Sequence, residues 1–271
     1  MMMKIVHTDD PEFRSLMIGA FLDRGDHRKF EIHFTDLINC LMCCYMRKIM
    51  PERRDDSKYT DILDWGGGLV FDTTITNLFG GKTRVGIGEA QGDIDMMVPL
   101  PSVGRPIPYE LTSTMFLPRD IIGMVQRRER YAYKIDQLKL YMAALCETSG
   151  KFKVLQRFKP RNSEPDGHAM PWEGPKKRFQ VIEHTFSIEL TPIDLARLRI
   201  AIIKRARSLI TALSSPSAWN LIPENYRPIL KDSWCKDEKG ICNSYQWART
   251  HPEKTYKAWR NWLKRKVNLS K

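Results

Sequence analysis

A change in hydrophobic periodicity along the chain constrains its fold more than any other sequence feature. Apolar residues recur at helical spacing over 35–45 and 61–78, and then alternate with polar residues over 84–98. Alternation is typical of half-buried strands, so we predict a strand pair over 84–98 with a turn near Gly92. The first part of the chain is therefore helical, and it leads into a sheet.

Strands and helices continue to alternate after this point. Thr191-Pro192 is a helix start signal, because a capping threonine precedes proline at the first helical position. The order of predicted elements indicates an α/β fold with a central mixed β-sheet flanked by helices, plus a helical C-terminal extension. The intervening segments are Ile107–Thr112 (strand), Met124–Leu145 (helix), Phe152–Phe158 (strand) and Phe179–Leu190 (strand).

The net charge of +12 and the pI near 9.4 indicate a polyanionic partner, most often nucleic acid, although basicity also serves solubility. No apolar run approaches the ~18–20 residues that span a bilayer, and residues 1–10 lack the apolar segment of a signal peptide. We therefore expect a reducing, cytoplasmic location. There, the six cysteines are more naturally thiols or metal ligands than disulfides.

Two acidic segments fall on predicted strands. Asp93 and Asp95 share one face of their strand, and Glu110 and Thr112 share one face of the next. If these strands pair, Asp95 and Glu110 converge. Two carboxylates repel unless a cation such as Mg²⁺ or Mn²⁺ lies between them, and such a cation can activate water against a phosphate. Taken alone, an acidic pair on a strand is more often a solvated edge.

Gln137 and Tyr141 on the following helix are i and i+4, so both can point toward the strands. With Gly92-Asp93-Ile94-Asp95 and Glu110, this Gln-x-x-x-Tyr completes an ordered set that resembles the RecB-family nucleases of the PD-(D/E)XK superfamily. The similarity is greatest to the CRISPR-associated RecB-like exonucleases and their viral relatives.

The resemblance implies a restriction-endonuclease-like core over 51–190, between an N-terminal helical segment (1–50) and a helical C-terminal region (191–271). It implies that Asp95, Glu110 and the carbonyl of Leu111 hold the metal ion. It also implies that Gln137 and Tyr141 support the site and contact DNA.

The chain departs from the family pattern at two positions. Asp72 stands where the family has a histidine, and an aspartate can still hold a hard cation. Thr112 stands where the family has the strand lysine, and a hydroxyl brings no positive charge to the reacting phosphate. Lys134 lies on the same helical face as Gln137 and Tyr141, so we hypothesise that it replaces the strand lysine. The alternative for Lys134 is a solvated or DNA-backbone lysine.

The cysteines at the two ends of the chain resemble the family's 4Fe-4S ligands, which staple the ends together. Cys40 matches the N-terminal ligand, and Cys235 and Cys242 the C-terminal ones, which leaves the usual set of four thiolates one short. Either Cys43 or Cys44 could supply the fourth, Asp232 could fill in, or zinc could replace the cluster. Buried structural thiols are the alternative to any metal site.

These features together predict a Mg²⁺- or Mn²⁺-dependent deoxyribonuclease that trims single-stranded DNA, with Arg127, Arg128 and Arg130 holding the strand beside Gln137 and Tyr141. The alternative is a catalytically silent RecB-like DNA-binding accessory in CRISPR spacer acquisition or viral recombination. Its partners would then be CRISPR adaptation or recombination proteins in a prokaryotic or virus-infected cell. The basic, aromatic tail around 256–266 would either hold nucleic acid or pack as an amphipathic helix.

Overall fold

A computed structural model describes residues 30–38, 40–50, 72–78, 80–100, 104–114, 121–129, 131–158, 180–222 and 242–269 of the chain. Its strands are β1 (Ile32–His33), β2 (Thr83–Ile87), β3 (Ala90–Ile94), β4 (Met96–Leu100), β5 (Arg105–Thr114), β6 (Ser149–Phe158) and β7 (Gln180–Glu189). Its helices are α2 (Phe34–Ile38), α3 (Leu41–Ile49), α5 (Ile121–Gln126), α6 (Ala132–Leu145), α7 (Pro192–Ser214), α8 (Asn243–Thr250) and α9 (Pro252–Leu269), with the 3-10 helix η3 (Ala218–Leu221). Residues 72–78 are also helical.

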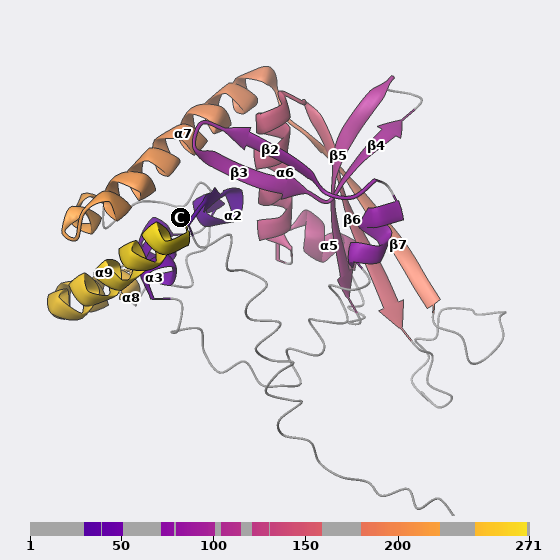
Figure 1. Cartoon of the computed structure of the whole chain (residues 1–271). Coiled ribbons are helices and arrows are strands. Elements are labelled where there is room, and N and C mark those ends of the chain that lie inside the picture. Colours follow the sequence, from indigo (N-terminus) through magenta and orange to yellow (C-terminus); the bar gives the residue numbers. More distant parts are fainter. Residues whose placement is uncertain are drawn as a thin grey trace, which may run out of the picture.

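The strands form two mixed sheets, so the predicted α/β class with helices around mixed strands is confirmed. One sheet has the order β1-β3-β2 and the other β4-β5-β6-β7. The parallel pairs are β1 with β3 and β5 with β6, and the latter two strands are connected through α5 and α6. In Figure 1, the open end of the β2–β3 hairpin lies toward the larger sheet, its turn lies on the side away from that sheet, and α7 runs above the hairpin.

The core lies mainly between the helices and the β1-β3-β2 sheet. One large cluster of buried side chains draws on α2, α3, α6, α7, α8 and α9. A smaller cluster on the other sheet contains Met96, Ile107, Tyr109, Leu111 and Leu155, and Ile75 of the 72–78 helix packs against it. The C-terminal helices thus share the main core with α2 and α3, about 200 residues earlier in the chain, which matches the predicted helical extension.

The strand pair over 84–98 turns at a different place from the predicted one. The hairpin reverses at Gly88-Glu89, and Gly92 lies inside β3, opposite Val85. Gly88 has a φ of +57°, a left-handed conformation that favours glycine, so it takes the turn. Gly92 is needed for a different reason, namely the close packing described below.

Two predicted helices are each divided in two. The segment 124–145 splits into α5 and α6 because Arg128 and Tyr131 have positive φ angles of 61° and 56°, which interrupt the helical hydrogen bonds. The helix expected from Thr35 splits at Cys40, which becomes the N-cap residue of α3. Apolar periodicity cannot detect such breaks, since the residues on both sides still face the same core.

Other predicted elements are found close to where the sequence indicated. β5, β6 and β7 cover the three later predicted strands with small shifts at their ends. Thr191 and Asp194 form a capping box at the start of α7, in which each side chain bonds the other's backbone N–H. Of the segment predicted as a helix over 61–78, only 72–78 lies within the described residues. No helix in the described ranges is both long and apolar enough to traverse a lipid bilayer.

Candidate functional site

Asp95 and Glu110 are brought together where the two sheets meet. Asp95 is the single residue between β3 of one sheet and β4 of the other. In the β4–β5 register Met96 lies opposite Tyr109, which sets Asp95 beside Glu110. The backbone N–H of Leu111 donates a hydrogen bond of 3.0 Å to Asp95 Oδ2. The pairing of β4 with β5 thus orients the carboxylate of Asp95 and places the carboxylate of Glu110 in the interior.

Glu110 is completely buried, with an exposed fraction of 0%. Burial raises the pKa of its carboxyl to about 8, although the Lys134 ammonium opposes this and the Asp95 carboxylate adds to it. Its Oε2 atom is buried without a hydrogen-bond donor among the described residues. A buried acceptor of this kind beside a second carboxylate is suited to binding a cation.

A lysine is paired with each of the two carboxylates. Lys134 on α6 places its Nζ 2.5 Å from Glu110 Oε1. Burial by itself would lower the pKa of Lys134, but the Glu110 carboxylate outweighs it and the pKa is raised. Lys82, just before β2, places its Nζ 2.8 Å from Asp95 Oδ1 and is 43% exposed. Lys134 was predicted to enter the site, whereas Lys82 was missed because no spacing relates it to the acidic motifs.

The predicted third carboxylate is not part of this group. Among the described residues, the potential ligand atoms of Asp72, Asp95 and Glu110 do not lie together within 4.8 Å. Asp72 is at the first described residue of the 72–78 helix, which contacts the larger sheet through Ile75. Thr112 follows on β5, partly buried and opposite Val154 of β6. The site in this structure therefore consists of Asp95 and Glu110 with their lysines.

The glycine and tyrosine motifs contact each other directly. A Cβ atom added to Gly92 would lie 2.7 Å from Cε1 of Tyr141 and 2.8 Å from Cδ2 of Phe34, so only glycine fits. The Tyr141 hydroxyl donates a 2.8 Å hydrogen bond to the carbonyl of Asp93, and Gln137 Nε2 donates to that hydroxyl at 2.5 Å. These contacts fix the strand two residues before Asp95.

This packing corrects the predicted DNA contact of Tyr141. The side chain is only 2% exposed, so it positions β3 and cannot reach a DNA strand. Gln137 is partly exposed and remains a candidate for such a contact.

The predicted arginine cluster is largely neutralised by acids. Arg127 pairs with Glu129 at 2.7 Å, and Arg128 pairs with Asp136 of α6. Arg130 lies outside the described residues. A paired arginine attracts phosphate less than a solvated one, so these ion pairs weaken the predicted attraction of Arg127 and Arg128 for a phosphate backbone.

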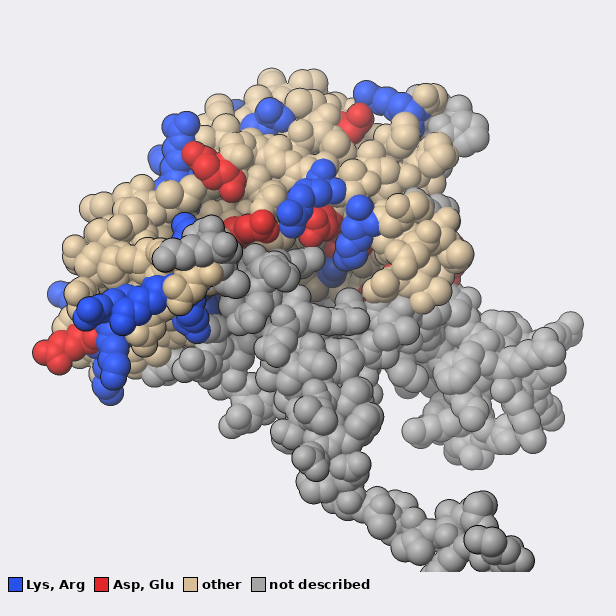
Figure 2. Space-filling view, viewed as in Figure 1, with Lys and Arg blue, Asp and Glu red and all other residues tan. Residues whose placement is uncertain are grey.

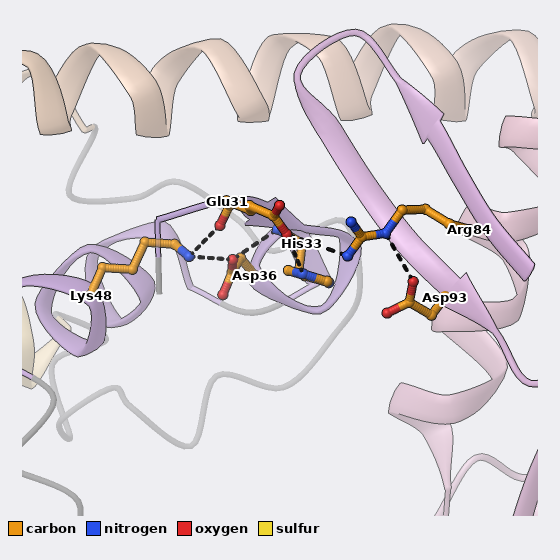
Figure 3. A network of polar contacts seen from close by, with 6 residues as sticks. All are labelled: Glu31, His33, Asp36, Lys48, Arg84 and Asp93. Carbon is orange, nitrogen blue, oxygen red and sulfur yellow. Dashed lines mark hydrogen bonds and ion pairs between the residues drawn. The ribbon is translucent and has the colours of Figure 1, made fainter. Parts of the chain in front are cut away.

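An ion-pair network connects β3 to the N-terminal helices (Figure 3). Arg84 on β2 pairs with Asp93 at 3.1 Å and with Glu31 at 3.4 Å. The backbone carbonyl of Glu31 accepts a 2.7 Å hydrogen bond from Lys48 of α3, which also pairs with Asp36 at 2.8 Å. Asp93 is therefore held through both its side chain and its carbonyl, which adds to the positioning of Asp95.

Three cysteines form the second candidate site. Cys40 Sγ and Cys43 Sγ each lie 3.5 Å from Cys242 Sγ, and all three sulfur atoms are within 4.8 Å of one another. Cys40 and Cys43 lie at the start of α3, whereas Cys242 caps α8. Three thiols this close could bind a metal ion.

Cys43 and Cys44 are the two candidates for the additional N-terminal ligand, and they make different contacts. Cys43 faces Cys242, and hydrogen bonds with Cys242 and Cys40 raise the pKa of its thiol. Cys44 instead donates to the carbonyl of Asp36 at 3.0 Å, and burial raises its pKa to about 12. Cys44 is therefore a buried structural thiol. Cys235 and Asp232, the other predicted ligands, lie outside the described residues.

Comparison with known proteins places this chain in no family. No protein-family model matches it, and no curated protein matches it. A solved structure named "Crystal structure of SSO0001" aligns over 71% of this chain and 86% of that chain, with 14% sequence identity and a TM-score of 0.39. A likeness this low supports no inference about fold or function.

Proposed function

We propose that the chain is a metal-dependent DNA nuclease with a restriction-endonuclease-like core of the RecB type, which hydrolyses phosphodiester bonds at single-stranded DNA ends. The observation that carries the proposal is the convergence of Asp95 and Glu110 beside a partly buried lysine from α6. A carboxylate pair with a neighbouring ammonium group is suited to metal-assisted phosphodiester hydrolysis.

Asp95 and Glu110 are the residues that would hold Mg²⁺ or Mn²⁺, with the carbonyl of Leu111 as the predicted further ligand. The buried, unsatisfied Oε2 of Glu110 supports this fit. A divalent cation bound there would activate a water molecule and neutralise charge on the phosphate. Lys82 balances the charge of Asp95 when no such cation is bound, and its partial exposure lets it move aside.

Lys134 would supply the positive charge that Thr112 cannot. Its Nζ lies against Glu110, so it can donate a hydrogen bond to a nonbridging oxygen of a phosphate at the site. Gln137, one turn further along α6, could contact the bound strand, while Tyr141 holds β3 in place.

The cysteine cluster would have a structural role in this enzyme. Cys40, Cys43 and Cys242, with Cys235 or Asp232 as the further ligand, would hold a 4Fe-4S cluster or a zinc ion. Either would bind the N-terminal and C-terminal helices to each other. The proposed location is the cytoplasm, where such thiolates stay reduced.

The runner-up is a silent DNA-binding protein that acts as an accessory in CRISPR spacer acquisition or viral recombination. Thr112 and the lysine paired with each carboxylate favour it, since a site filled by ammonium groups needs no divalent cation for charge balance.

A cleavage assay separates the two candidates. Labelled single-stranded and duplex DNA are incubated with Mn²⁺ and either wild type, Glu110→Ala or the matched variant Glu183→Ala, which changes an exposed carboxylate on β7. We expect wild type and Glu183→Ala to cleave, and Glu110→Ala to be inactive. Equal, metal-independent background from all three proteins would favour the silent binder.

A further inference from the structure

The outer face of α9 carries a dense row of basic side chains. Lys257, Arg260 and Lys264 are exposed and lie at positions i, i+3 and i+7, so they share one side of the helix. Lys254 and Lys266 are exposed on its flanks. Glu253 is the only acidic residue of the helix. Figure 2 shows a group of basic side chains at the end of the molecule occupied by α9.

These three side chains differ from most described basic groups of the sheet region in having no acidic partner among the described residues. Lys82, Arg84, Arg105, Lys134 and Lys153 all form ion pairs with carboxylates. Within the described part of the chain, Lys257, Arg260 and Lys264 form none. Their charge is therefore available to a ligand from outside the molecule.

The opposite face of α9 is committed to the protein core. Trp259 and Trp262 are buried, the latter 3% exposed, and the indole N–H of Trp259 donates a 2.9 Å hydrogen bond to the carbonyl of Leu213 on α7. A tryptophan held in this way cannot stack on a base. The segment 256–266 therefore has features of both sequence-based alternatives. Its tryptophans pack in the core, as in an amphipathic helix, and its basic side chains are exposed to solvent.

We propose that Lys257, Arg260 and Lys264 form a docking surface for the phosphate backbone of a nucleic acid. A row of solvated cations spanning about 10 Å along a helix matches a polymer with repeated negative charges better than a single small anion. Tyr256, which is 49% exposed on the adjacent side of α9, offers an aromatic ring for a base of a single strand.

An anionic membrane is the less suitable polyanion. Helices that lie in a bilayer interface bury an apolar face among the lipids, whereas the two tryptophans of α9 are already buried in the protein, and the large apolar side chains that stay exposed on it are Tyr256, Leu263 and Val267. Nucleic acid requires only the charged side.

This surface goes beyond the proposed nuclease site, because it would bind nucleic acid whether or not the carboxylates cleave it. It would also supply the phosphate contacts that were expected from Arg127 and Arg128, since both arginines form ion pairs with acidic residues of the chain. In Figure 2 the α9 surface and the charged groups over β2 and β3 lie on the same side of the molecule.

The test measures binding in EDTA, where no divalent cation is present. The full chain is titrated into fluorescein-labelled 30-nucleotide oligothymidine or a 30-base-pair duplex, and fluorescence anisotropy is recorded at several salt concentrations. We expect the triple variant K257Q/R260Q/K264Q to bind about tenfold more weakly or worse, and the slope of log K against log salt to fall by about two to three.

A matched triple variant, R197Q/K204Q/R207Q, removes the same charge from exposed positions of α7 and should retain most of the wild-type affinity. Thermal unfolding of both triples checks that they fold. Equal losses from the two triples would overturn the proposal, because the effect would then be one of net charge. A loss of binding to phosphatidylserine vesicles without a loss of oligonucleotide binding would also overturn it.

The binding titration is independent of cleavage, because EDTA removes the divalent cation that the proposed carboxylate site needs. A protein that fails to cleave in Mn²⁺ but loses oligonucleotide binding in the α9 triple would contradict the nuclease proposal and support the docking surface. The reverse pattern would contradict the docking surface alone.

Discussion

At the level of single residues, the ammonium group beside Glu110 is supplied by a helix and not by a strand. The strand position that would carry a lysine in the resembling family holds a hydroxyl, and the ammonium group beside Glu110 comes from α6 instead. The i, i+3, i+7 relation of Lys134, Gln137 and Tyr141 made this prediction possible from sequence. Lys82 had no comparable signal, because its approach to Asp95 depends on how β2 enters its sheet.

The first prediction concerns Lys134. Lys134→Ala should reduce Mn²⁺-dependent cleavage by about 100-fold or more, since it removes a preorganised donor from the reacting phosphate. Single-turnover cleavage of labelled DNA measures the effect. Lys139→Ala, which removes another lysine of α6 paired with Asp136, is the control and should remain active. Undiminished cleavage by Lys134→Ala would end the idea that this lysine replaces the strand one.

The second prediction concerns the pH dependence of stability. The pKa of Glu110 is about 8 in the folded chain against an ordinary value of 4.5, so the folded state binds this proton more tightly. The resulting stabilisation is complete below pH 4.5 and is lost as the pH rises through about 8, with a slope of at most about 1.4 kcal/mol per pH unit. Urea unfolding of metal-free protein at several pH values measures it.

Glu110→Gln keeps the shape of the side chain and removes its titration, so the decline in unfolding free energy between pH 4.5 and 8 should flatten. Glu183→Gln, a change to an exposed carboxylate, should leave the decline unchanged. An identical decline in wild type and Glu110→Gln would show that another group is responsible.

At the scale of elements, the contact between β3 and α6 organises the site. Gly92 makes room for the ring of Tyr141, and the Tyr141 hydroxyl holds the carbonyl of Asp93. Two motifs whose contacting residues, Asp93 and Tyr141, are 48 positions apart in the sequence are therefore one packing unit. Asp95 follows directly, at the end of the strand that this unit fixes.

The third prediction tests that unit. Gly92→Ala should cost about 1–3 kcal/mol of unfolding free energy, because the new methyl group overlaps the rings of Tyr141 and Phe34. Chemical denaturation of Gly92→Ala, Tyr141→Leu and the double variant measures the coupling. Since a leucine leaves out part of the ring that the methyl group meets, the two changes should be less than additive. Strict additivity would contradict the packing explanation.

At the scale of the whole molecule, the cysteine cluster connects the two ends of the described chain. Cys40 and Cys43 start α3, and Cys242 caps α8 about 200 residues later. The hydrophobic core makes the same connection, since α8 and α9 pack against α3. A metal ion bound by these thiols would add to a contact that the core already specifies.

The fourth prediction concerns this cluster. Anaerobically purified protein should contain iron or zinc, and Cys242→Ser should lose the metal and unfold at a lower temperature. Elemental analysis, visible absorbance and thermal unfolding measure the three effects. Cys146→Ser, at an exposed cysteine on the C-cap of α6, is the control and should keep its metal. Equal metal content in the two variants would exclude these thiols as ligands.

Much of the element order could be predicted from the sequence, because periodicity, the Thr191 cap and the spacing of acidic residues are local signals. They indicated α/β class, the strand that carries Glu110, the strand that ends directly before Asp95, and the helical face of Lys134. The break between α5 and α6 could not be predicted, since it depends on left-handed backbone at Arg128 and Tyr131. The ion pairs of Arg127 with Glu129 and of Arg128 with Asp136 could not be predicted from the sequence either.

The sequence by itself determined which residues could do chemistry in this protein: two carboxylates on neighbouring strands, a lysine one helical turn from a glutamine, and cysteines near both ends. Tertiary structure alone decided which of them meet. It left Asp72 out of the group, brought Lys82 in, turned Cys43 toward Cys242 and Cys44 away, and left Lys257, Arg260 and Lys264 of α9 without an acidic partner among the described residues. Each outcome depends on contacts between distant segments, and packing of the whole chain sets those distances.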